Sequence, residues 1–171
     1  MLKPLGQWCC DTCGDVIEGP EDGCIEWHTT HRTNTVAGFR VVHRSGKCVY
    51  QGVELATLGR TSSLLPLTDA IDSTGLGHML VILEQSLREG SVRDEALNEM
   101  IEVLRRVQIP YYEEARLAWQ AGIKEGIHDG SRYDSATLKR LIHWKDAAIA
   151  AWVASVTGED TVPRVMTAGA S

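Results

Sequence analysis

The chain has 171 residues, a hydrophobic fraction of 43% and a formal net charge of −6. This length is enough for one domain with its own core, or for a small module joined to a helical one. No apolar run approaches the ~20 residues that a membrane-spanning helix needs. The acidic balance argues against binding to polyanions through bulk charge.

Residues 1–6 contain no long apolar segment of the kind found in secretory signals, so we expect a cytoplasmic, reducing environment. The five cysteines are therefore expected to be metal ligands or free thiols rather than disulfide partners. Residues 27–53 contain no Asp or Glu but carry four Arg or Lys residues and three histidines. This segment predicts a mildly basic surface on an otherwise acidic chain.

Short strands and turns are predicted for the first third of the chain. β-Branched and aromatic residues favour strands over 24–30 and 38–43, with a turn over 19–23 before the first strand. The connection over 53–66 leaves two alternatives open. It fits a short strand near 54–58, or a short helix that begins near Leu67.

Beyond residue 60 the apolar residues recur with the period of a helix, and four helices are predicted. The first has Ser73 as a candidate cap and Gly90 as its end, and the second follows Ser91, which forms a candidate capping box with Asp94. The third begins near Pro110 and the fourth near residues 134–135. The apolar residues that recur at helical spacing in these four segments are Leu76, Met79, Leu80, Leu83 and Leu87; Leu97, Met100, Ile101, Leu104 and Val107; Ala115, Trp119 and Ile123; and Leu138, Leu141, Ile142, Ile149 and Trp152.

The segment Cys10-Asp11-Thr12-Cys13-Gly14 is the most specific motif in the chain. Two cysteines separated by two residues and followed by glycine form the tight turn that places two thiolates on one zinc ion. Glycine helps because the backbone must turn sharply while its N–H groups point at the sulfurs. The motif therefore predicts one half of a zinc site.

His43 and Cys48 are the predicted second half of the zinc site, since they flank a Ser-Gly turn at the end of a predicted strand. We leave Cys24, His28 and His31 open as alternative ligands, although an alternating strand places His28 and His31 on opposite faces. Cys9 in place of Cys10 gives a less suitable spacing. Four protein ligands form a closed site, so the predicted zinc is structural rather than catalytic.

Residues 8–50 resemble zinc-ribbon and related zinc-finger modules through the Cys-x2-Cys-Gly motif and the weaker segment 42–48. A common ribbon has a second Cys-x2-Cys pair, whereas this chain has His-x4-Cys. The whole chain resembles small bacterial or phage proteins that join such a module to helices. The resemblance implies a binding scaffold and no particular reaction.

These observations predict an α+β fold with three parts. Residues 1–60 form a small β module stapled by zinc, residues 61–156 form a bundle of about four helices, and residues 157–171 form a flexible tail.

The function predicted from the sequence is protein–protein interaction, in a zinc-binding regulatory protein without catalytic residues. A phage or mobile-element inhibitor of a host complex fits this description, and a homodimer is compatible with it. The alternative is a nucleic-acid-associated regulator that uses the basic hairpin 28–47, and a weaker alternative is a metal-dependent enzyme. The candidate partner-binding residues are Arg32, Arg40, Arg44, Lys47, Tyr111, Tyr112, Arg116 and Trp144.

Overall fold

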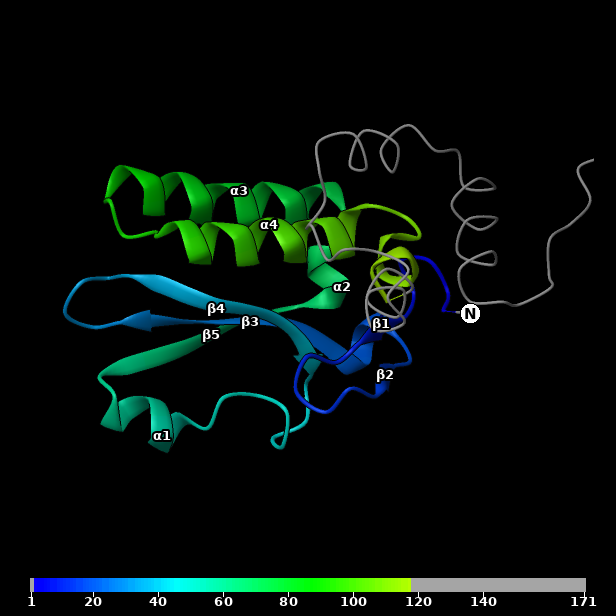
Figure 1. Ribbon diagram of the computed structural model, residues 1–171, viewed down its shortest axis with the longest axis horizontal. Helices are drawn as coiled ribbons and strands as arrows, with labels where there is room; N and C mark the ends of the chain where they lie inside the picture. Colours follow the sequence, from blue (N-terminus) through cyan, green and yellow to red (C-terminus); the bar gives the residue numbers. More distant parts are fainter. Residues whose placement is uncertain (1, 118–171) are drawn as a thin grey trace, which may run out of the picture. The chain divides into compact units, whose positions relative to one another are not determined.

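A computed structural model describes residues 2–117 of the chain, and its fold is α+β (Figure 1). The chain divides into two compact units, Met1–Glu113 and Glu114–Ser171. The elements described below belong to the first unit. Residues 112–117 are helical, which agrees with a helix that begins near Pro110.

Two small antiparallel sheets make up the β structure. The first pairs β1 (Trp8–Cys9) with β2 (Val16–Ile17). A 3-10 turn, η1 (Pro20–Asp22), leads into the second sheet. That sheet has the order β4-β3-β5 and consists of β3 (Gly23–Thr30), β4 (Val36–His43) and β5 (Arg60–Pro66).

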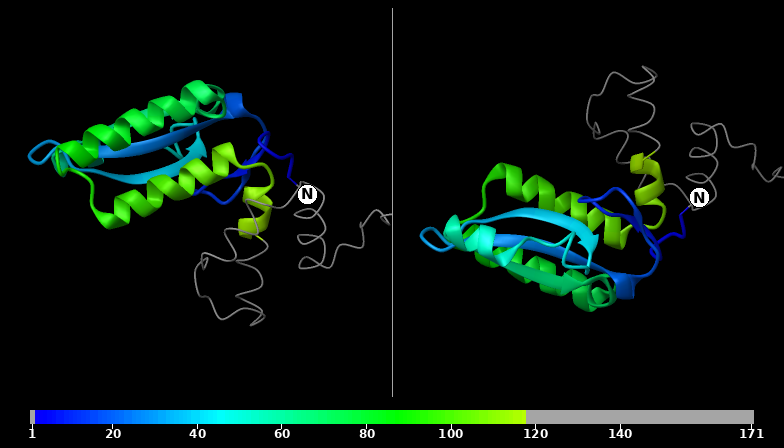
Figure 2. Two further views of the ribbon diagram at one scale, coloured as in Figure 1. Left: turned by 90° about the horizontal axis from the view of Figure 1, so that it is seen from above. Right: turned by 90° about the horizontal axis from the view of Figure 1, so that it is seen from below.

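Among residues 2–111, four α-helices accompany the sheet, and only two of them are long. The short helices are α1 (Gly52–Thr57) and α2 (Leu67–Ala70), and the long ones are α3 (Ser73–Arg88) and α4 (Asp94–Gln108). The long helices lie side by side over one face of the sheet, and α1 lies on the other side (Figures 1 and 2). Gly75 lets α3 approach α2 closely, because a Cβ atom there would lie 2.2 Å from the Asp69 carbonyl oxygen.

The core lies between this sheet face and the two long helices. The rings of Trp27 and Phe39 stack on the sheet side with their centroids 5.7 Å apart. Met79, Met100 and Val103 are buried on the helix side. The strand pairing is regular except for one register shift between β3 and β4, where Glu26 pairs with Arg40 and His28 with Ala37. Sheet and helices therefore share one hydrophobic core.

Several sequence predictions are confirmed by these elements. The two predicted strands are β3 and β4, the two predicted helices over 73–90 and 91–107 are α3 and α4, and α2 begins at the predicted Leu67. Gly90, with a φ of 61°, follows the end of α3. The helix caps differ, because Asp72 and not Ser73 accepts the Gly75 N–H, and Arg93 occupies the N-cap of α4.

Other predictions were wrong or are not confirmed. Residues 54–58 do not form a strand, because Glu54, Leu55 and Ala56 favour a helix and α1 buries Leu55. Strand β5 was not predicted, and it begins at the residue where the predicted β module ends. The described residues do not confirm a bundle of about four helices. The predicted fourth helix, most of the third and the predicted tail lie outside the described residues.

Candidate metal centre

The first half of the site is a tight turn between β1 and β2, which we call the knuckle (residues 10–15). The Gly14 N–H donates to the Cys10 carbonyl oxygen and the Cys10 N–H donates to that of Asp15, both at 2.9 Å. Gly14 has a φ of 81°, in the left-handed region that favours glycine. The knuckle thus places Cys10 and Cys13 on one side of a short, locally determined turn.

The second half is the ligand loop (residues 43–48), which begins at the last residue of β4. The loop bends after His43, and the Cys48 N–H donates to the Ser45 carbonyl oxygen at 3.0 Å. The Thr12 hydroxyl of the knuckle donates to the Cys48 carbonyl oxygen at 2.8 Å. This bond ties the two halves together directly.

Four donor atoms converge where the two halves meet. The ligand atoms of Cys10, Cys13, His43 and Cys48 all lie within 4.8 Å of one another, close enough to hold a metal ion. His43 Nδ1 is 3.5 Å from the Cys13 sulfur and 3.9 Å from the Cys48 sulfur. A tetrahedron with metal–sulfur bonds of about 2.3 Å and a metal–nitrogen bond of about 2.0 Å has edges of about 3.5 to 3.8 Å. The two distances from His43 Nδ1 are close to these edges, and all four donor atoms are close enough to hold a metal ion.

The orientation of the His43 ring also suits a metal ligand. Its Nδ1 faces the sulfurs, while its Nε2 lies 3.2 Å from the carbonyl oxygen of Val16 in β2. A hydrogen on Nε2 completes that bond and leaves the Nδ1 lone pair free for an ion. Histidine ligands of metals are commonly oriented by a hydrogen bond of this kind from the second ring nitrogen.

The thiols of Cys10 and Cys13 differ in pKa because their surroundings differ. Burial opposes ionisation of Cys10, but backbone N–H groups of Cys13, His43 and Thr12 and the His43 ring lower the pKa of its thiol to about 6. The Asp15 N–H favours the Cys13 thiolate, yet desolvation and the neighbouring Cys10 and Cys48 sulfurs raise the pKa of the Cys13 thiol to about 11. Thiolates this close repel one another, and a bound cation would remove that repulsion.

A buried arginine of α4 fixes the knuckle. Arg106 is 3% exposed, and it donates to the Asp11 carboxylate at 2.6 Å, to the Glu113 carboxylate at 2.7 Å and to the Cys9 carbonyl oxygen at 2.7 Å. The Asp11 carboxylate also accepts the Val41 N–H of β4 at 2.8 Å. Asp11 therefore connects the knuckle to β4. The knuckle is thus held by residues nearly 100 positions away in sequence.

A second arginine fixes the ligand loop. Arg40 of β4 donates to the Cys48 carbonyl oxygen at 3.2 Å and to the carboxylate of Glu26 at 2.9 Å, and Glu26 is only 1% exposed. The other carboxylate oxygen of Glu26 accepts the Tyr50 N–H at 2.7 Å. The Arg40 guanidinium also lies 3.6 Å from the centre of the Tyr50 ring. The chain from Cys48 to Tyr50 is therefore anchored to the sheet.

The alternative ligands considered from the sequence lie outside the cluster. Cys24 is fully buried opposite Val42, and burial raises the pKa of its thiol to about 11. His28 is buried beside Tyr50, and its Nδ1 has no hydrogen-bond partner among the described residues. His31 bonds with the Thr61 hydroxyl beyond the far end of β3.

The candidate partner-binding residues do not form one patch. Arg32 follows β3, whereas Arg44 and Lys47 follow β4 at the other end of the sheet, about 26 Å away along eight-residue strands. Arg40 is used inside the protein, as described above. Tyr112 is 2% exposed and donates its hydroxyl to Glu102 at 2.7 Å. Tyr111 and Arg116 are half-buried, and Trp144 lies outside the described residues.

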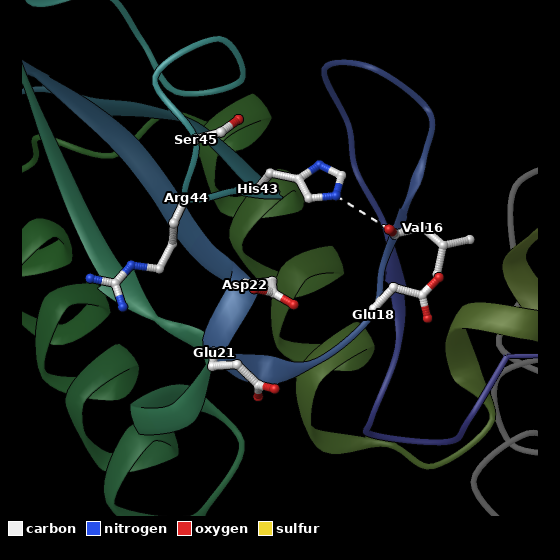
Figure 3. Close-up of a pocket in the computed structure, with 7 residues that line it drawn as sticks. All are labelled: Val16, Glu18, Glu21, Asp22, His43, Arg44 and Ser45. Atoms are coloured by element: carbon white, nitrogen blue, oxygen red, sulfur yellow. Dashed lines mark hydrogen bonds between the residues drawn. The ribbon is translucent and has the colours of Figure 1, made fainter.

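A shallow hollow adjoins the metal centre, and Figure 3 shows the side chains around it. It lies on the Nε2 side of His43, where the dashed line marks the bond to Val16, and so faces away from the sulfurs. Three of the lining residues carry a carboxylate and one carries a guanidinium. The lining residues are Val16, Glu18, Glu21, Asp22, His43, Arg44 and Ser45.

Comparisons with protein-family models, with curated proteins and with solved structures found no match to this chain. Within residues 2–117, no helix is long and apolar enough to cross a membrane. The site is therefore interpreted from its geometry alone.

The two buried ion networks are the functional residues that sequence reasoning missed. Arg106 lies beside the apolar positions of the buried face of α4 and donates to the Cys9 carbonyl oxygen next to the knuckle. A charged residue at a core-facing helix position is the available sequence signal. Glu26 gives a comparable signal as an acid within the apolar strand β3.

Proposed function

We propose that the cluster binds zinc, and that the chain is a zinc-stapled binding protein whose partner is another protein. The observation that carries the metal assignment is the convergence of three sulfurs and one imidazole nitrogen within 4.8 Å. Sulfur-rich tetrahedral sites with one histidine are typical of zinc. A bound zinc ion would crosslink the chain, because two of its ligands come from the knuckle and two come from the ligand loop.

The proposed role of the ion is structural, because four protein side chains fill a tetrahedron and leave no vertex for water. Cys10 and Cys48 are buried at 2% and 6% exposure, so two of the four ligands are shielded from solvent. The resemblance to zinc-ribbon modules agrees with this role. A structural ion contributes to folding and leaves the outer surfaces of the protein for binding.

The proposed partner is a protein because α3 exposes large apolar side chains. Leu80, Val81 and Leu87 project from this helix with 47%, 59% and 55% of their surface accessible. Exposed apolar side chains gathered on one helix are a common feature of protein-binding surfaces. In contrast, Arg40 is paired with Glu26 and Arg32 lies far from Lys47, so the basic hairpin offers little continuous positive surface.

Metal analysis of the purified chain tests the first part of the proposal. We expect one zinc per chain, and we expect a chelator to release it with loss of the folded structure around the knuckle. A chain that folds identically without bound metal contradicts a structural zinc.

Site-specific crosslinking in the native host tests the second part. A photoreactive residue at Val81 is expected to capture one dominant protein, whereas the same residue at the exposed Thr57 of α1 serves as the control. Equal labelling from both positions, or no capture at Val81, contradicts a partner on α3.

A further inference from the structure

The open edge of β5 is a binding surface that the metal centre does not involve. Strand β5 pairs with β3 through seven consecutive residues without a bulge, from Arg60 opposite Thr30 to Pro66 opposite Cys24. Among residues 2–117, β3 is the only strand that pairs with β5. Alternate N–H and C=O groups of an edge strand point away from its neighbour, so β5 presents a row of unpaired backbone groups.

The opposite edge of the same sheet is protected. There, Val36 of β4 bridges Val92, and the Asp11 N–H donates to the Val41 carbonyl oxygen while the Asp11 carboxylate accepts the Val41 N–H. Within the described residues, no comparable backbone hydrogen bonds are made to β5 beyond its pairing with β3, although α1 lies next to β5. The common devices that protect an edge, such as a bulge or a charged side chain in mid-strand, are also missing from residues 61–65.

We propose that β5 pairs antiparallel with β5 of a second copy of this chain, so that two three-stranded sheets become one six-stranded sheet. The strand is self-complementary about Ser63. With the two-fold axis there, Thr61 of one copy faces Leu65 of the other, and no two charged residues of β5 face each other.

The charges and the apolar side chains of β5 favour pairing with a second copy in this register over pairing with a strand of another protein. Arg60 of each copy lies opposite Pro66 of the other, at the end where the exposed Asp69 of α2 follows. The two Arg60 side chains lie at opposite ends of the strand pair, so their like charges are kept apart. Leu64, which is 53% exposed, comes within diagonal reach of Leu64 of the second copy.

The pairing closes at two copies, because each copy has one open edge of this kind and a two-fold axis uses both. A single strand pair with a few side-chain contacts makes a small interface. Interfaces below about 1,200 Å² belong to the weak and transient class. The dimer is therefore expected in the micromolar range or weaker, and it needs no metal chemistry of its own.

Sedimentation of the full-length, metal-loaded chain from about 10 µM to about 1 mM tests the proposal. We expect a reversible monomer–dimer equilibrium, and slower amide hydrogen exchange in residues 61–65 as the concentration rises. Leu64→Lys places two like charges near the axis and should weaken the dimer at least tenfold. Val53→Lys is the matched control at an apolar position of α1 that is 81% exposed, and it should dimerise like the wild type.

Unchanged metal content and circular dichroism show that each variant is folded. A wild-type chain that stays monomeric over the whole range overturns the proposal, and then an extended strand from another protein becomes the better occupant. Dimerisation of Leu64→Lys at wild-type strength, or its loss in Val53→Lys, also overturns it. These outcomes are independent of whether zinc occupies the cluster.

Discussion

The two halves of the candidate metal centre, the knuckle and the ligand loop, position their ligands by different means. The knuckle is shaped by its own backbone, with Gly14 in the left-handed region and two hydrogen bonds inside residues 10–15. The ligand loop has one short turn at Ser45 and otherwise depends on Arg40, Glu26 and Tyr50. A local motif and a tertiary network therefore contribute two ligands each.

Both halves nevertheless depend on a buried arginine that hydrogen-bonds to backbone next to a ligand. Arg106 reaches the Cys9 carbonyl oxygen, and Arg40 reaches that of Cys48. Arg106 is almost fully buried between two carboxylates, whereas the Arg40 side chain keeps 23% of its surface exposed. We expect the knuckle network to contribute more to stability, and the loop network to act mainly on metal affinity.

The largest effect is expected from Cys10→Ser, because this substitution removes one of the four ligands of the ion that joins the two halves. In the presence of zinc, the free energy of unfolding should fall by more than about 3 kcal/mol, because metal binding contributes directly to folding. Chemical denaturation with and without zinc measures this. Cys9→Ser is the matched control, since a serine there can keep the bond to the Gly14 carbonyl oxygen. Similar losses in both variants would contradict the assignment of ligands.

Arg106→Met tests the knuckle network. It leaves Asp11 and Glu113 without their shared cation, and breaking a buried ion pair costs about 3–5 kcal/mol. The control is Arg88→Met on α3, where an exposed pair with Glu84 contributes about 0.5 kcal/mol or less. Denaturant titrations of the two variants compare them. If Arg106→Met were as stable as Arg88→Met, the knuckle would not depend on α4.

Arg40→Met tests the loop network. The partial exposure of Arg40 reduces the expected loss of stability to about 2–3 kcal/mol, because solvent screens the pair. Zinc affinity should fall by about 10- to 100-fold, as expected when a group that orients a ligand is lost. A competition assay with a chromophoric chelator measures the affinity. A stability loss without any change in zinc affinity would separate this network from the site.

The smallest effects on stability are expected from replacing a glycine by alanine in each half of the site. Gly14→Ala forces alanine into a positive φ and should cost about 1–2 kcal/mol, although its Cβ would meet no atom within 4 Å. Gly46→Ala in the ligand loop meets no atom and has no positive φ, so the cost should stay within about 0.5 kcal/mol. Thermal melts of both variants decide this. Equal costs would show that the knuckle has no special backbone requirement.

The same contrast explains what the sequence could predict. Cys10 and Cys13 were found because a Cys-x2-Cys-Gly turn is determined within five residues. His43 and Cys48 stayed in competition with Cys24, His28 and His31, because only the tertiary anchors Glu26 and Arg40 decide where the ligand loop lies. Strand β5 escaped prediction because its serines interrupt the apolar alternation, and its place is decided by pairing with β3. The long helices α3 and α4 were found because their apolar period repeats over four turns.

Cobalt(II) titration of the full-length chain, followed by its visible absorption spectrum, tests the central claim most directly. Cobalt reports the ligand set, because tetrahedral sites with three thiolates and one imidazole give intense visible bands that octahedral sites lack. We predict saturation at one cobalt per chain with a tetrahedral spectrum, and displacement of cobalt by zinc. Absence of those bands, or a chain without Cys48 that binds cobalt in the same way, would contradict a metal held by Cys10, Cys13, His43 and Cys48.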